Sequence, residues 1–197
     1  EMGRRIAYLP TLADSAASQL SSMQEKAAEI AAWEYERIVY LGFGCLRGLA
    51  REGAVKSQEL TNGRICASYD TPTGFRHGPK TILNNKTLTV MMTSPLKLAR
   101  LYDLDMIQEL TDQKVENRVA VVTDTGTQHD LDGADYVYRC QTPAEYAGCE
   151  INAYIFCLLF LQILSFEKSC QLGITTDNPC PGGEVNRVVQ GIIIHEE

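Results

Sequence analysis

A six-residue stretch decides the fold of this chain: RVAVVT, at residues 118–123. Its four central residues are apolar and consecutive, whereas a strand with one face in water alternates apolar and polar residues. Such a strand has to be covered on both faces of its sheet, and helices provide that cover in parallel sheets. The stretch therefore predicts a doubly wound α/β fold.

The rest of the chain repeats this alternation of short strands and helices. Segments rich in β-branched and aromatic residues predict strands at 37–41, 64–69, 87–93, 118–123 and 135–139. Helical patterns are present at residues 14–35, 46–61, 96–113 and 144–172. We expect a three-layer, Rossmann-like domain with a five-stranded parallel sheet flanked by helices.

Length and composition are those of one globular domain. The 197 residues include 18 Lys and Arg against 25 Asp and Glu, a net charge of −7, and 45% of them are hydrophobic. This composition excludes a coiled coil, a collagen and a disordered chain, and the acidic charge disfavours nucleic acid or an anionic membrane as partner. We expect a helical lead-in at residues 1–36, the α/β domain at 37–172 and a tail at 173–197.

The seven cysteines are not arranged as a disulfide framework or a metal site. Their number is odd, and no two have the C-x-x-C spacing. We therefore expect reduced thiols in a cytoplasmic protein with no metal. The apolar run at residues 151–166 is too short for a membrane span and predicts a buried core helix, so no membrane partner is expected.

Ligands of doubly wound sheets bind beyond the carboxyl ends of the strands. The first such loop contains Gly42 and Gly44 and leads into a helix, whose first N–H groups favour phosphate. Its third glycine, Gly48, is one residue too far for the dinucleotide fingerprint, so a nicotinamide cofactor is disfavoured. The alternative is that these glycines serve only a tight turn.

The helix at residues 46–61 has a charged stripe beside its apolar face. At 100° per residue, Glu52, Lys56 and Glu59 share a narrow arc. One interpretation is a solvated row of ion pairs. The other is that Lys56 keeps the Glu59 carboxylate ionised, ready to move a proton between neighbouring carbons.

The most unusual loop is at residues 73–80, with the sequence TGFRHGPK. It places His77 between Arg76 and Gly78, which is a poor environment for a packed core histidine. A histidine with a pKa near neutrality suits proton transfer or polarisation of a sugar ring oxygen.

These stretches resemble a known family. YLGFG at 40–44, AREGAVKSQELT at 50–61 and YDTPTGFRHGPK at 69–80 resemble the sugar isomerase (SIS) domain. With residues 102–105 and 185–195, they are similar to the C-terminal half of the tagatose-6-phosphate ketose/aldose isomerase family, also regarded as amino-sugar-phosphate deaminase/isomerases.

The resemblance implies a phosphosugar aldose–ketose isomerase that transfers a proton between C1 and C2 and needs no cofactor. By analogy with the isomerase half of glucosamine-6-phosphate synthase, Glu59 is the base, Lys56 lies beside it, and His77 opens the sugar ring. That histidine comes from a neighbouring subunit in the synthase. The resemblance therefore implies a homodimer or a pairing with another SIS domain.

Two departures from the family matter. The first is that the synthase forms a Schiff base with a tail lysine where this chain has Gln190. The second is that family members have two SIS domains and this chain resembles only the second, whereas the Ser/Thr-rich phosphate loop lies in the first. Thr93 and Ser94 take the equivalent strand end. We expect substrate contacts from a set of seven residues: Gly42, Gly44, Lys56, Arg76, Thr93, Ser94 and Gln190. The alternative function is a non-catalytic phosphosugar-binding or regulatory module.

Overall fold

The computed structural model describes residues 2–113, 115–124, 131, 133–142, 149–185, 188 and 191–195. Its strands are β1 (Arg37–Gly42), β2 (Cys66–Asp70), β3 (Thr87–Met92), β4 (Arg118–Asp124) and β5 (Tyr136–Cys140). Its helices are α1 (Met2–Ala31), α2 (Leu46–Leu60), α3 (Pro72–Arg76), α4 (Lys97–Asp112) and α5 (Glu150–Gln171), with a 3₁₀ turn at Pro79–Ile82.

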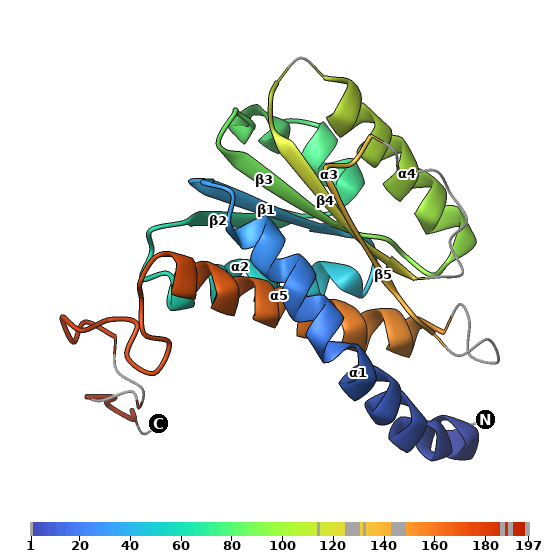
Figure 1. Ribbon diagram of the computed structural model, residues 1–197, viewed down its shortest axis with the longest axis horizontal. Coiled ribbons are helices and arrows are strands. Elements are labelled where there is room, and N and C mark those ends of the chain that lie inside the picture. Colours follow the sequence, from blue (N-terminus) through green and yellow to red (C-terminus); the bar gives the residue numbers. More distant parts are fainter. Residues whose placement is uncertain are drawn as a thin grey trace.

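The five strands form one parallel sheet in the order β2-β1-β3-β4-β5. The chain adds β2 on one side of β1 and then places β3, β4 and β5 on the other. Helices cover both faces, with α1, α2 and α5 on one and α3 and α4 on the other (Figure 1). The predicted doubly wound fold is confirmed.

The apolar strands are buried because their alternate residues enter two different cores. Ile38 and Tyr40 of β1 pack toward α1, α2 and α5, whereas Val39 and Leu41 pack toward α3 and α4. All four side chains are at most 1% exposed. A polar side chain at any of these positions would face a helix rather than water.

The helix α1 is longer than predicted and belongs to the main core. It begins at Met2, continues through Pro10 and ends at Ala31, four residues before the predicted end. Its buried face packs on α5, and Tyr8 Oη donates a hydrogen bond to Asn152 Oδ1 at 2.6 Å. The expected lead-in is therefore packed against the α/β domain.

The helix α3 and the following 3₁₀ turn were not predicted. Thr71 caps α3 by accepting a hydrogen bond from the Gly74 N–H, Pro72 fixes its first turn and Phe75 anchors it in the core. This local capping suffices for five residues, too few for a helical period to show in the sequence. The predicted start of α5, residues 144–148, lies outside the described residues.

Among the described residues, α5 is the one helix that is long and apolar enough to cross a membrane. Half of its most apolar window is buried inside the protein. Phe156, Phe160, Leu161 and Leu164 are at most 1% exposed and pack in the core shared with α1 and α2. This packing explains the apolar sequence of α5 without a membrane.

Lys168 joins α5 to the end of α1. Its Nζ donates hydrogen bonds to the carbonyl oxygens of Ala31 at 3.1 Å and Trp33 at 2.8 Å, and lies 3.9 Å from the centre of the Tyr35 ring. Burial lowers the pKa of Lys168 to about 8, because the charged form is poorly solvated there. The amine therefore supplies a donor to the Ala31 carbonyl at the end of α1 and a second donor to the Trp33 carbonyl, which also accepts from the Tyr35 N–H.

We predict that Lys168→Met lowers the free energy of unfolding by about 1–3 kcal/mol at pH 7, since the carbonyls of Ala31 and Trp33 each lose a hydrogen bond. Between about pH 8 and 10 the folded state releases the Lys168 proton while the unfolded state keeps it, so the wild type gains stability relative to the variant. The gain is at most about 1.4 kcal/mol per pH unit. Urea unfolding of both proteins at pH 7, 8, 9 and 10 tests this, and a constant difference contradicts it.

Candidate active site

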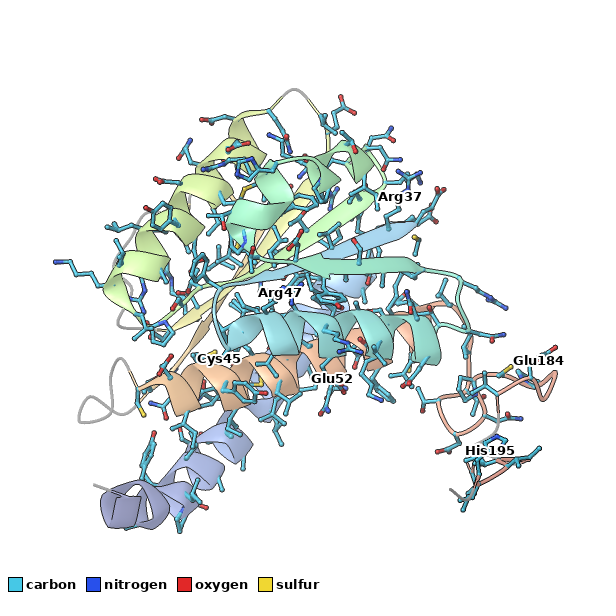
Figure 2. The ribbon with its side chains drawn as sticks, turned by 180° about the vertical axis from the view of Figure 1, so that it is seen from behind. Arg37, Cys45, Arg47, Glu52, Glu184 and His195 are labelled. Atoms are coloured by element: carbon cyan, nitrogen blue, oxygen red, sulfur yellow. The ribbon has the colours of Figure 1, made fainter. Side chains whose placement is uncertain are left out.

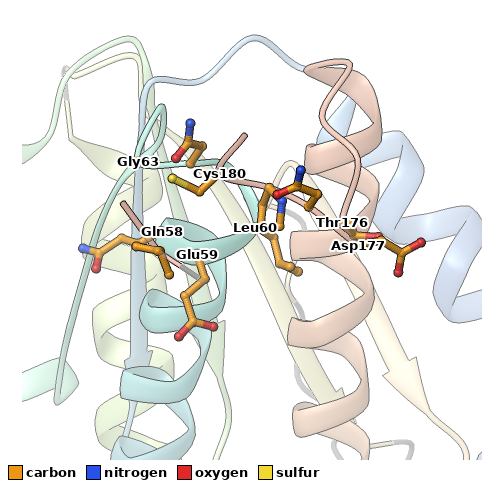
Figure 3. A pocket seen from close by; sticks show the side chains of 11 residues that line it. Gln58, Glu59, Leu60, Gly63, Thr176, Asp177 and Cys180 are labelled. Carbon is orange, nitrogen blue, oxygen red and sulfur yellow. The ribbon is translucent and has the colours of Figure 1, made fainter. Parts of the chain in front are cut away.

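A large cavity lies at the carboxyl end of α2, between that helix and the C-terminal tail (Figure 3). It is open to solvent and has a volume of about 920 Å³. One wall is formed by the end of α2 and the turn after it, and the other by the tail. The lining residues are Gln58, Glu59, Leu60, Asn62, Gly63, Thr176, Asp177, Asn178, Pro179, Cys180 and Val185.

The helix α2 is held in place by its contact with β1. Gly53 lies directly on the Tyr40 ring, where an added Cβ would approach the ring carbons to 3.1 Å. The Tyr40 hydroxyl is 2.8 Å from Ser57 Oγ, which in turn is 3.3 Å from Ser165 Oγ on α5. Burial raises the pKa of Tyr40 to about 12, so its hydroxyl stays neutral.

The turn after α2 forms the floor of the first wall. Asn62 and Gly63 have positive φ angles of 51° and 69°, and the Gly63 N–H donates to the Gln58 carbonyl at 2.8 Å. This is the left-handed termination common at helix ends, where glycine has no steric penalty. It ends the helix one residue after Glu59 and leaves the Glu59 side chain at the cavity.

Glu59 and Lys56 act as one charged unit. Lys56 Nζ is 2.6 Å from Glu59 Oε2 and 4.0 Å from Glu52 Oε1. The hydrogen bond to Glu59 is the main cause of a raised pKa of Lys56, so the lysine keeps its charge. Glu59 lines the cavity and Glu52 does not. A carboxylate held beside an ammonium group and open to a cavity can accept a proton from a bound molecule.

The chemistry of the cavity suits hydroxyl and amino groups better than phosphate. Its polar lining consists of amides, a hydroxyl and carboxylates: Gln58, Asn62, Asn178, Thr176, Glu59 and Asp177. No Lys or Arg is among the described residues that line it. Phosphate is usually bound by cationic side chains or free N–H groups.

Gly42 and Gly44 lie at the other end of α2. The helix rises about 20 Å over its 15 residues, so these glycines are remote from Glu59 (Figure 2 labels Cys45 at one end and Glu184 near the other). An added Cβ on Gly42 would lie 2.7 Å from the Leu46 carbonyl oxygen, and Gly44 has a φ of 59°. Both glycines are therefore required by the turn itself.

The N–H groups at the start of α2 are already bonded. Those of Leu46, Arg47 and Gly48 donate to preceding carbonyls at 3.1–3.2 Å. The phosphate site expected at this helix start has no free donor among these three groups.

Thr93 and Ser94, at the carboxyl end of β3, are also bonded internally. The Ser94 N–H donates to Asp103 Oδ2 at 2.7 Å, the Thr93 N–H to the Val122 carbonyl at 3.0 Å, and Thr93 Oγ1 to Thr123 Oγ1 at 2.7 Å. Both residues are at most 4% exposed. The Asp103 carboxylate thus occupies the position that an anion would take at this strand end.

His77 and Arg76 lie on the opposite face of the sheet from Glu59. His77 is exposed at the end of α3, and Arg76 Nε is 2.5 Å from Glu109 Oε2 on α4. Lys80 also forms an ion pair with Glu109. Within one chain the structure therefore brings Lys56 and Glu59 together, and it does not bring His77 to them.

The remaining predicted contact, Gln190, lies outside the described residues. The tail residues that line the cavity, including Asp177 and Asn178, were missed from the sequence. The pattern DNPCP at 177–181 indicates only a turn. No cluster of metal-ligating side chains is present in the part of the chain that the structure describes.

Comparison with known proteins places this geometry in a class. No family model matches the chain. The chain is 41% identical to the D-galactosamine-6-phosphate deaminase AgaS of Escherichia coli O157:H7 over 161 residues, which are 82% of this chain and 41% of the relative.

Two solved structures are also similar. Tagatose-6-phosphate ketose/aldose isomerase from Escherichia coli matches with a TM-score of 0.77 and 33% identity, covering 94% of this chain and 46% of that one. A structure from Clostridium novyi NT matches with a TM-score of 0.79 and 36% identity, covering 98% and 51%.

The parallel sheet and the charged stripe on α2 define a domain of the sugar isomerase (SIS) class. Within that class the chain is homologous, over most of its own length, to AgaS and tagatose-6-phosphate ketose/aldose isomerase proteins. It spans about half or less of the length of these relatives.

We predict a specific pH signature for Asp103. Burial raises the pKa of this carboxyl group to about 6, partly offset by the Ser94 N–H and by Arg100. Between pH 6 and 4 the folded state holds a proton that the unfolded state has released, so stability from this group rises as pH falls. In urea unfolding, the free energy of unfolding of the wild type should therefore rise relative to that of Asp103→Asn as the pH falls from 6 to 4.

The matched control is the exposed Asp105 on the same helix, whose substitution by Asn should leave this slope unchanged. Equal pH slopes for wild type and Asp103→Asn would refute the role of Asp103.

Proposed function

We propose that this chain is one half of a phosphosugar aldose–ketose isomerase, or isomerase/deaminase, that acts in the cytoplasm on tagatose 6-phosphate or galactosamine 6-phosphate type substrates. The observation that carries the proposal is the Lys56–Glu59 pair facing a cavity lined with amides and carboxylates. The names of its homologues, a galactosamine-6-phosphate deaminase and a tagatose-6-phosphate isomerase, support the same substrate class.

In the proposed mechanism Glu59 removes the proton from one of the two carbons C1 and C2 of the open-chain sugar and returns it to the other. Lys56 Nζ lies 2.6 Å from Glu59 Oε2 and holds the carboxylate in position beside the cavity. The amides of Gln58, Asn62 and Asn178 can hold sugar hydroxyl groups. No metal or redox cofactor takes part.

The ring-opening histidine has to reach the cavity from a different polypeptide or domain. His77 is exposed on the face opposite Glu59, so it is available to a site outside its own chain. We therefore expect a homodimer or a pairing with another SIS domain, in which each His77 serves a neighbouring Glu59.

The phosphate group is expected to bind outside the cavity described above. The lining of that cavity contains no described cation, and the N–H groups of Thr93 and Ser94 are bonded within the chain. The cations Arg76 and Lys80 already pair with Glu109. We expect that the other SIS half supplies the phosphate loop, as the length of the relatives allows.

We predict that Glu59→Gln in the intact protein lowers turnover of both sugar phosphates at least ~100-fold, because the amide cannot accept the proton. Binding, measured by calorimetry, should persist. Glu52→Gln is the matched control, since Glu52 is on the same stripe and within 4.0 Å of Lys56 but does not line the cavity. Normal turnover by Glu59→Gln would refute the assignment of the base.

A second candidate function is a non-catalytic module that binds phosphosugars. The placement of Glu59 and His77 on opposite faces of the sheet favours it, since a single chain then does not bring both catalytic groups together. An intact protein that binds both sugar phosphates and converts neither would leave this second function.

A further inference from the structure

Ser169 on α5 connects the two walls of the Glu59 cavity. Its Oγ is 2.8 Å from the Leu60 carbonyl oxygen on α2 and 3.3 Å from the Ile174 carbonyl oxygen in the tail. Leu60 directly follows Glu59 and itself lines the cavity. Ile174 lies two residues before Thr176, where the second wall begins.

The position is completely closed to solvent. Ser169 is 0% exposed, so water does not replace its hydroxyl as a donor to either carbonyl. The Ile174 N–H also donates to the Ser169 carbonyl at 3.0 Å, and Gly173 turns the chain with a φ of 69°. The start of the tail is therefore held at Ser169 twice. The Ile174 N–H bonds the Ser169 carbonyl, and the Ile174 carbonyl contacts the Ser169 hydroxyl.

The Leu60 carbonyl is one of the last acceptors of α2, which no residue within the helix can satisfy. The Ser169 hydroxyl supplies that donor from a different helix. As a result, the final turn of α2, with Glu59 on it, is fixed relative to α5 and to the tail that follows α5.

We propose that Ser169 is a positioning residue that sets the distance between Glu59 and the tail wall, and so the shape of the substrate cavity. This role rests on the proposed function for its effect on turnover, but the connection of the two walls can be measured without substrate. Ser169 touches no substrate itself, since it does not line the cavity.

The first measurement uses Cys180 in the intact protein. This thiol lines the tail wall, is 8% exposed, and donates a hydrogen bond to Glu184 Oε2 at 3.1 Å. Ser169→Ala should increase its alkylation by iodoacetamide about five-fold, since loss of one buried hydrogen bond allows the tail to open more often. Mass spectrometry of the Cys180 peptide separates it from the exposed Cys45, Cys66 and Cys170.

The matched control is Ser165→Ala, one turn earlier on α5. Ser165 is equally buried and its hydroxyl also contacts α2 and a backbone carbonyl, through Ser57 and Leu161. It does not contact the tail. Ala favours a helix at both positions, so both variants should fold. We expect the two variants to have comparable melting temperatures. We expect faster Cys180 alkylation only in Ser169→Ala.

The second measurement is turnover at a temperature where both variants are folded. Ser169→Ala should lower kcat/KM about ten-fold, because a small displacement of a base has a large effect on rate, and Ser165→Ala should stay within about two-fold. Unchanged Cys180 alkylation in Ser169→Ala, or unchanged kcat/KM despite faster alkylation, overturns the proposal. If the wild type turns over no sugar phosphate, the proposed function fails and the alkylation result alone decides whether Ser169 holds the walls together.

Discussion

The close packing of α2 on β1 is the constraint on which the rest of the structure depends. Gly53 allows the helix to rest on the Tyr40 ring, and the Tyr40 hydroxyl reaches Ser57 one turn further along. A side chain at position 53 would push α2 away from the sheet. The helix carries Lys56 and Glu59, so this contact also places both side chains relative to the sheet.

The two ends of the sheet have different roles in this chain. At the carboxyl end of β3, in the region where doubly wound proteins bind ligands, the N–H groups of Thr93 and Ser94 are engaged by the protein itself. At the other end, α2 stops beside the tail and leaves an open cavity. The fold is one that usually binds ligands at the carboxyl ends of its strands. The Glu59 cavity lies instead at the end of α2 that is remote from Gly42 and Gly44.

Much of the fold could be predicted because burial on both faces leaves a strong mark in the sequence. Apolar runs such as residues 118–123 locate strands to within one or two residues. The short α3 leaves no such mark, since it is held by the Thr71 cap and one anchor, Phe75. The length of α1 was missed because its first turns are stabilised by packing on α5, which the local sequence does not specify.

By itself the sequence determined the layers and the alternation of strands with helices along the chain. It also determined the charged stripe of Glu52, Lys56 and Glu59. All of these follow from local periodicity. Only the tertiary structure decided which of these carboxylates faces a cavity and which donors are already bonded. The reason is that the cavity wall comes from residues 176–185, more than a hundred positions after Glu59 in the chain. Such a contact depends on how the end of α2 packs on α5 and the tail, and the buried Ser169 hydroxyl links these segments.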